Sequence, residues 1–399
     1  MQAITRLSDG LKQYLLITGN YWVFTLTDGA LRMLVVLHFH QLGYSPLNIA
    51  LLFLFYEVFG VITNLLGGWL GAILGLNRTM NIGLAIQIIA LSMLLVEPSH
   101  LTVAWVMIAQ ALSGIAKDLN KMSAKSAIKL LIPSHAQTSL YKWVALLTGS
   151  KNTLKGIGFF LGGLLLNLVG FHDAILLMVI ALVLTWVISL IALKKELGKT
   201  RFKPAFNTLF SKEPVINYLS AARLFLFSAR DVWFVVALPV YLSTQLGYDF
   251  WKVGGLLACW VIGYGVIQAF APTITGQHAN KQYLAKWAYG LFFIPALMAL
   301  ALHYFSQPAY ILLIGLVLFG FLFAINSSLH SYLIVSHAQR EGVSMDVGFY
   351  YMANAFGRLI GTLLSGWLYQ LYGLESCLWV SSIFIAIAAI ISTNLASTK

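Results

Sequence analysis

The 399-residue chain is poor in charge, since only 10% of its residues are Asp, Glu, Lys or Arg, whereas 59% are hydrophobic. A water-soluble globule cannot bury that much apolar surface, so the composition excludes a soluble domain. The two isolated cysteines, Cys259 and Cys377, make no metal or redox motif and indicate no disulfide framework. Walker A, Gly-x-Ser-x-Gly and His-Glu-x-x-His strings are also missing, which argues against ATP-driven pumping and the familiar hydrolases. We therefore expect a polytopic membrane protein that uses no cofactor and no bound metal.

Apolar runs recur along the whole chain and are separated by short turns with Gly, Pro, Asn or His. Each run has about 20 or more residues, which is enough to cross the hydrocarbon of a bilayer as a helix. The sequence therefore predicts an all-α membrane protein. Its twelve transmembrane helices are expected at residues 15–40, 46–74, 79–97, 101–125, 139–169, 173–194, 215–244, 250–273, 283–304, 309–335, 344–370 and 374–395.

One long polar stretch, residues 195–214, divides these runs into six and six. It predicts a six-helix bundle over 1–194, a cytoplasmic linker over 195–214 and a second six-helix bundle over 215–399. An even number of crossings puts both termini on one side, and basic residues gather in the connections of that side, whereas the opposite connections offer essentially only Lys252. This positive-inside pattern predicts cytoplasmic termini. The basic residues expected on the inner side are Arg6, Lys12, Arg78, Lys129, Lys194, Lys195, Lys199, Arg201, Lys203, Lys212, Lys281, Lys286, Arg340 and Lys399.

Internal repeats support two pseudosymmetric halves. The tetrapeptides "QLGY" and "SHAQ" each occur twice, at offsets of 204 and 202 residues. A third alignment, of "GLLLNLVGF" with "GWLYQLYGL", superposes Lys155 on Arg358. Equivalent positions should flank the central axis, so each base can approach one end of a doubly anionic substrate. The alternative is that each base only neutralises its own bundle, for example Arg358 with Asp346.

Charged residues also lie deep in the predicted spans, where each costs roughly 2.5 to 3.5 kcal/mol. The bases outnumber the acids there, which favours an anionic substrate over a cationic drug. Uncharged polar residues complete the expected site, although each of these is more often an interhelical hydrogen-bonding residue. The candidate substrate ligands are Arg32, Lys117, Lys121, Lys151, Lys155, Arg223, Arg230, Arg358, Asn152, Asn326, His330, Tyr350 and Asn354, and the candidate coupling or ion-pairing acids are Asp28, Glu57, Asp118 and Asp231.

Spacing suggests how two of these groups are arranged. Asp28 and Arg32 lie at i and i+4, so they can pair on one helix face and leave guanidinium donors for an oxyanion, or form a purely structural ion pair. Arg230 is the deepest base of its span. Its planar guanidinium matches two oxygens of a tetrahedral oxyanion, so it is the preferred single phosphate or arsenate ligand.

Like charges repeat on one face of the fourth predicted span, because Lys117, Lys121 and Lys125 follow one another at i, i+4. An anion should relieve their repulsion, and Asp118 can do so locally. Two interpretations remain open for this face. It attracts or binds substrate, or it is a solvated inner gate with Lys125 close enough to the cytoplasm to snorkel.

Twelve spans, two six-helix halves and a basic central loop resemble the major facilitator superfamily over the whole chain. The superfamily loop G-x-L-x-D-R-x-G-R-R survives only as "GWLGAILGLNR", with Ala72 in place of the Asp. More narrowly, "TGNYWVFTLTDGALRMLVVLHFHQLGYSP", "LLFLFYEVFGVITNLLGGWLG" and "LGLNRTMNIGL" are similar to the organoarsenical efflux permeases called ArsJ.

The resemblance implies a secondary-active carrier that exports 1-arseno-3-phosphoglycerate by alternating access and confers arsenate resistance, as an antiporter or uniporter. It also implies a functional link to a glyceraldehyde-3-phosphate dehydrogenase and a place in the bacterial cytoplasmic (inner) membrane.

The residues themselves indicate a small anionic substrate such as an arsenate or phosphate ester, and an organophosphate or sugar-phosphate exchanger of the same fold is the alternative. A membrane-embedded enzyme or lipid-handling protein that uses His330 or His337 is the rival from another class. We expect a monomer in contact with membrane lipids, and no nucleic-acid partner, because much of the +12 net charge serves topology and contact with anionic lipids.

Overall fold

A computed structural model describes residues 9–44, 52, 54–132, 137–193, 197–200, 213–276 and 281–397. Most of the predicted linker and the beginning of the second predicted span lie outside the described residues. So do several of the basic residues expected on the inner side, namely Arg6, Lys194, Lys195, Arg201, Lys203, Lys212 and Lys399.

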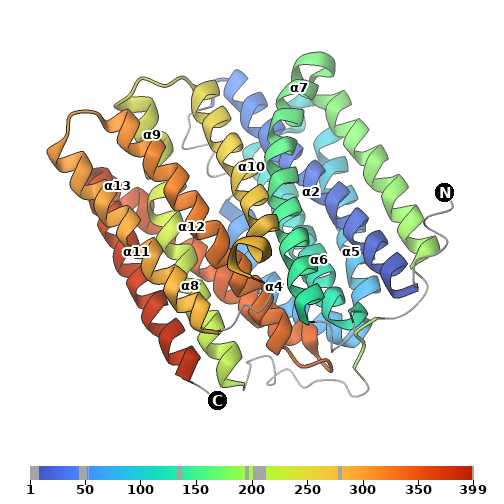
Figure 1. Ribbon diagram of the computed structural model, residues 1–399. Helices are drawn as coiled ribbons and strands as arrows, with labels where there is room; N and C mark the ends of the chain where they lie inside the picture. The colour runs from blue at the N-terminus through green and yellow to red at the C-terminus, as the bar shows by residue number, and fades with distance from the viewer. Residues whose placement is uncertain are drawn as a thin grey trace.

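The described part of the chain is built from helices and contains no strand (Figure 1). In chain order the elements are α2 (Asp9–Gln41), α4 (Leu54–Leu74), α5 (Leu76–Ser92), the 3-10 turns η1 (Met93–Leu95) and η2 (Pro98–His100), α6 (Val103–Leu131), α7 (Gln137–Ala192), α8 (Pro214–Phe234), α9 (Ala237–Thr244), α10 (Phe250–Thr275), α11 (Lys281–Tyr304), α12 (Pro308–His337) and α13 (Val343–Ser397).

Two of these helices, α7 and α13, are too long for one crossing. Their 56 and 55 residues would measure about 80 Å if straight, against about 30 Å of hydrocarbon. Each is interrupted at a glycine, Gly170 with φ 79° and Gly373 with φ 78°, in a backbone region that glycine enters readily. Figure 1 shows α7 turning back on itself, so each of these helices supplies two crossings.

The described helices account for the twelve predicted crossings. Length and apolarity mark nine segments of the described chain as able to span a membrane, with α7 and α13 counted once each. α6 is also long enough, at 29 residues, although it carries several lysines. α8 and α9 together form one span, Pro214–Thr244. Eight single spans and two reversing helices make twelve.

Positive-φ glycines recur at equivalent places in the two halves. Gly43 and Gly247 lie 204 residues apart, and Gly170 and Gly373 lie 203 apart, which matches the offsets of the sequence repeats. Only glycine occupies this conformation among the described residues. The chain is therefore built from two structurally similar bundles.

The two halves meet where glycines let backbones approach closely. Gly149 of α7 faces the backbone of Gly265 on α10, and Gly68 of α4 faces the backbone of Ser344 and Gly348 on α13. A Cβ at Gly149 or Gly68 would overlap a backbone atom of the other half, so a larger residue forces the helices apart. Small residues at helix crossings are the usual means of close packing within a membrane.

A second contact between the halves lies at the end of the bundle where α6 and α12 terminate. Lys129 Nζ donates to the carbonyl of Ser336 in the last turn of α12, at 2.5 Å. Arg340 Nη2 donates to the carbonyl of Ile132, directly after α6, at 3.1 Å. The last carbonyls of a helix lack intrahelical donors and carry the negative end of its dipole. Each half therefore caps a helix of the other with a cation.

Candidate functional site

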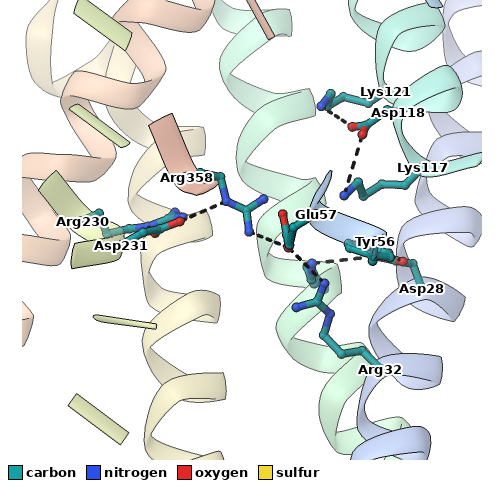
Figure 2. Close-up of polar contacts among 11 residues, drawn as sticks. Asp28, Arg32, Tyr56, Glu57, Lys117, Asp118, Lys121, Arg230, Asp231 and Arg358 are labelled. Atoms are coloured by element: carbon teal, nitrogen blue, oxygen red, sulfur yellow. Dashed lines mark hydrogen bonds and ion pairs between the residues drawn. The ribbon is translucent and has the colours of Figure 1, made fainter. Parts of the chain in front are cut away.

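Asp28 and Arg32 do not form the pair that their spacing suggests, because each takes a partner on another helix (Figure 2). Asp28 accepts the hydroxyl of Tyr56 at 2.9 Å, and its carboxylate lies 3.8 Å from Lys155 Nζ of α7. Arg32 Nη2 lies 3.4 Å from Glu57 Oε1 on α4, and its guanidinium sits over the Tyr56 ring. The i, i+4 spacing permits a pair, but α4 and α7 offer each group a competing partner.

Arg358 of α13 joins the two halves. Figure 2 shows it between Asp231 and Glu57: its Nη2 lies 2.9 Å from Glu57 Oε1 on α4, and its Nε lies 3.1 Å from Asp231 Oδ2 on α8. The other oxygen of Asp231 lies 2.5 Å from Nε of Arg230. Asp346, the alternative partner for Arg358, accepts a backbone N–H instead. Arg358 therefore does more than neutralise its own bundle.

The same acid–base pair occurs once in each half. Asp231 follows Asp28 by 203 residues, and Arg358 follows Lys155 by the same 203 residues. Each half thus places an acid on its first membrane crossing, α2 or α8, and a base on its fifth crossing, the first part of α7 or α13. The sequence alignment found the two bases, and the same offset would have found the two acids. Recognition of two substrate ends by Lys155 and Arg358 stays a prediction.

On α6, one buried carboxylate serves two lysines. Asp118 lies 2.5 Å from Lys121 Nζ and 3.9 Å from Lys117 Nζ, and only 1% of its side chain is exposed. Lys117 Nζ also lies 3.7 Å from the centroid of the Tyr56 ring. Asp118 therefore neutralises lysines of its own helix, which is the local role that the spacing permits. Three of the candidate bases form an ion pair with a carboxylate of their own helix and have partly exposed side chains, namely Lys117, Lys121 and Arg230.

Lys125 does not snorkel toward the membrane surface. It is 3% exposed, and its Nζ donates to Thr148 Oγ1 of α7 at 2.6 Å. The centroid of the Tyr351 ring lies 5.3 Å from the same Nζ. α6 continues to Leu131, more than a turn beyond the predicted end of the span, so Lys125 lies within the bundle. Its ammonium group therefore belongs to the interior.

A chain of polar side chains links α7 to α10 across the two halves. Lys151 Nζ donates to Asn152 Oδ1 at 3.1 Å, and Asn152 Nδ2 donates to Gln268 Oε1 at 2.5 Å. Gln268 Nε2 in turn donates to the hydroxyl of Tyr264 at 2.9 Å. Sequence reasoning missed Gln268 and Tyr264. Their i, i+4 spacing within an apolar span is the signal that identifies them.

Arg223 of α8 is buried among uncharged groups. Its Nε donates to Asn354 Oδ1 at 2.9 Å, and its Nη1 donates to the carbonyl and hydroxyl oxygens of Ser327 at 3.2 and 3.0 Å. The guanidinium carbon lies 3.9 Å from the centroid of the Phe227 ring. No carboxylate of the described residues lies within 4.0 Å of it.

The other uncharged candidates have different surroundings. Asn326 Nδ2 donates to the carbonyls of Trp287 and Leu322, both at 2.9 Å, which is the interhelical role that the sequence left open. His330 is buried in α12. Tyr350 is buried on α13, with its ring centroid 5.4 Å from the guanidinium carbon of Arg223. Tyr350 therefore lies against one of the basic site residues.

The family model described as Major Facilitator Superfamily matches residues 17–345 and 234–396, which together span nearly the whole chain. The chain belongs to the major facilitator superfamily. A comparison of this superfamily member with curated proteins finds no match. Membership of this family of transporters identifies the chain as a multi-pass membrane transporter and not an enzyme.

Solved structures share the fold of this major facilitator carrier over nearly its whole length. The human organic anion transporter MFSD10 (TETRAN) is similar with a TM-score of 0.75 at 13% identity, covering 97% of this chain and 100% of that chain. A bacterial homologue of the iron transporter ferroportin, in an outward-facing state, gives the same values. A single-residue variant of the E. coli fucose:proton symporter FucP gives a TM-score of 0.73 at 11% identity, covering 98% and 100%. At these identities the likeness shows the fold alone.

Proposed function

We propose that this carrier exports an organic phosphate or arsenate anion by alternating access, and that the anion is 1-arseno-3-phosphoglycerate. The single observation that supports an anion is the charge of the interior. Nine basic side chains share it with four carboxylates, Asp28, Glu57, Asp118 and Asp231, which leaves five more bases than acids. The nine bases are Arg32, Lys117, Lys121, Lys125, Lys151, Lys155, Arg223, Arg230 and Arg358.

An uncompensated positive charge in a low-dielectric interior is costly, and a multiply charged anion offsets that cost. Ammonium and guanidinium groups make charge-assisted hydrogen bonds with phosphate and arsenate oxygens. Trivalent arsenic instead prefers thiolate ligands. Cys259 is exposed and Cys377 is buried, and they form no thiolate site. The chemistry of the interior therefore suits a hard oxyanion.

The specific substrate is proposed from the resemblance of the first three spans to the ArsJ permeases, and the basic interior is compatible with it. The positive-inside pattern supports cytoplasmic termini, and hence a site that loads from the cytoplasm. With the cell interior negative, each net negative charge that leaves gains about 2.3 kcal/mol per 100 mV. Export of a polyanion then needs no proton input, as a uniporter or as an antiporter.

Transport into everted membrane vesicles tests this proposal. Labelled 1-arseno-3-phosphoglycerate, made fresh, should accumulate in vesicles that contain the carrier and not in vesicles from cells without it. Vesicles preloaded with inorganic phosphate or a sugar phosphate distinguish exchange, because an exchanger accelerates when the opposite side is loaded. No uptake of the arsenic ester above the carrier-free vesicles, together with uptake of a sugar phosphate, would replace the proposed substrate with the alternative.

A further inference from the structure

Three of the nine interior bases have no carboxylate partner among the described residues. They are Lys125 of α6, Lys151 of α7 and Arg223 of α8, here called the carboxylate-free cluster. Their hydrogen-bond acceptors are uncharged: the Thr148 hydroxyl for Lys125, the Asn152 amide oxygen for Lys151, and Asn354 and Ser327 for Arg223. The other six bases lie within 4.0 Å of an acid.

The members of this cluster share one neighbourhood. The Tyr351 ring centroid lies 5.3 Å from Lys125 Nζ, the Tyr350 ring centroid lies 5.4 Å from the guanidinium carbon of Arg223, and these two ring centroids are 5.0 Å apart. The polar chain that begins at Lys151 reaches Gln268 of α10, and the backbone carbonyl of Gln268 accepts the hydroxyl of Ser328 at 3.2 Å, next to Ser327, the partner of Arg223. The three bases are therefore linked through shared neighbours across the boundary between the halves.

Arg223 is the decisive member, because a guanidinium keeps its charge at every accessible pH. It is 3% exposed. Its Nε and Nη1 groups donate to Asn354 and Ser327, whereas its Nη2 group has no hydrogen-bond acceptor among the described residues. A buried, permanently charged group with free donors points to an anion that arrives from outside the protein.

We propose that the carboxylate-free cluster is the primary anion subsite of the carrier and that it takes a tetrahedral oxyanion with two negative charges, such as the terminus of a phosphate or arsenate monoester. Arg223 supplies two donors from Nη2, and Lys125 and Lys151 supply ammonium groups. This inference rests on the proposed function only in that the carrier binds an anion. It assigns the primary contact to Arg223, and leaves Arg230 to its pair with Asp231.

The cluster should also prefer a dianion to a monoanion. A phosphate monoester carries close to two negative charges near pH 7 and offers three acceptor oxygens. A carboxylate offers one charge and two oxygens, so it leaves more of the cluster's charge without compensation. The surrounding Thr148, Asn152, Ser327 and Asn354 are neutral, so no acid in contact with the cluster repels the second charge.

Equilibrium binding to the purified full-length carrier in nanodiscs tests the proposal. The probe is glycerol 3-phosphate, and glycerate serves as its monoanionic counterpart with the same carbon skeleton. Calorimetry at pH 7.5 should show that Arg223→Gln, Lys125→Gln and Lys151→Gln each weaken glycerol 3-phosphate binding at least tenfold. Glycerate should bind weakly to every form. Lys286→Gln, an exposed base on α11, is the matched control and should bind within twofold of the unmodified carrier.

Arg223→Lys guards against a folding artefact, because it keeps the charge and loses the planar donors. It should elute as a monodisperse particle and still weaken glycerol 3-phosphate binding several-fold. Cluster variants that bind like the unmodified carrier, or an unmodified carrier that does not bind glycerol 3-phosphate, would overturn the subsite. The vesicle assay decides the proposed function separately. Cluster-dependent phosphate-ester binding without arsenic-ester transport would leave the subsite intact and remove only the arsenical substrate.

Discussion

Replacing Glu57 with Gln should weaken the link between the two halves, because Glu57 is the acid through which α4 contacts Arg358 of α13. The same oxygen, Oε1, lies 2.9 Å from Arg358 and 3.4 Å from Arg32. Gln keeps the size of the side chain and one carbonyl oxygen but removes the charge. Arg358 retains Asp231 of its own half, so the substitution isolates the contact between the halves.

The size of the effect follows from how much water reaches the pair. The side chains of Arg358 and Glu57 are 28% and 22% exposed, so the contribution of this pair to stability should lie between that of a surface ion pair and that of a buried, charged hydrogen bond. Surface pairs contribute about 0.2 to 1 kcal/mol, and hydrogen bonds to charged groups contribute about 1.5 to 3 kcal/mol. We expect the ion pair between Glu57 and Arg358 to stabilise the observed arrangement of the two halves by about 1 to 2 kcal/mol. Since about 1.4 kcal/mol is a factor of ten, the alternative arrangement of the halves should gain about 5- to 30-fold in population.

Distances between spin labels on the two halves measure that population. Leu168 and Leu371 are suitable positions, because both are exposed, they lie near the reversals of α7 and α13, and they are equivalent by the repeat. Cys259 and Cys377 are first replaced with Ser. In Glu57→Gln, pulsed electron–electron double resonance in nanodiscs should show a second distance growing at the expense of the first.

The matched control is Glu97→Gln, which removes an exposed carboxylate outside the site. It should leave the distance distribution unchanged. A distribution in Glu57→Gln that equals the unmodified carrier, or an equal shift in the Glu97 control, would refute the claim that this ion pair holds the halves in the described arrangement.

Three further predictions concern other parts of the carrier. Initial transport rates at matched protein levels should fall about tenfold more in Arg223→Lys than in Arg230→Lys, and the reverse order would restore the ligand that the sequence preferred. Gly149→Ala should lower the thermal stability by about 1 to 3 kcal/mol through overpacking, whereas Gly254→Ala, which meets open space, should not; equal melting points would contradict this. Arg340→Gln should cost about 0.3 to 1 kcal/mol of stability by removing one helix cap, and salt should reduce the difference in melting temperature; no difference at low salt would contradict it.

The helices were predictable because hydropathy depends on local sequence alone. The break between the predicted spans 139–169 and 173–194 falls at Gly170, where the structure reverses α7. Lys125 shows the limit of this reasoning. The predicted fourth span ends at residue 125, whereas α6 ends at Leu131, and those six residues move Lys125 from the membrane surface to the interior.

Ion-pair partners were less predictable than helices, because they depend on which helices become neighbours. Spacing within one helix pointed Asp28 to Arg32, but Lys155, on a helix more than a hundred residues away, is the base that it contacts. The spacing did suggest the contacts of Asp118, because its partners, Lys117 and Lys121, lie on its own helix. Short-range pairs can be inferred from spacing, whereas long-range pairs require the fold or an internal repeat.

The reciprocal caps at the ends of α6 and α12 have a consequence for behaviour in acid. Their acceptors are main-chain carbonyls of Ile132 and Ser336, which have no proton to gain in the accessible pH range, and their donors, Arg340 and Lys129, stay cationic as the pH falls. A contact between the halves that relied on a carboxylate would weaken once that acid was protonated, and Ala72 stands where the superfamily pattern has such an acid. These two caps between the halves are therefore insensitive to acidification. Because the acceptors belong to the backbone, no side-chain substitution at Ile132 or Ser336 removes them.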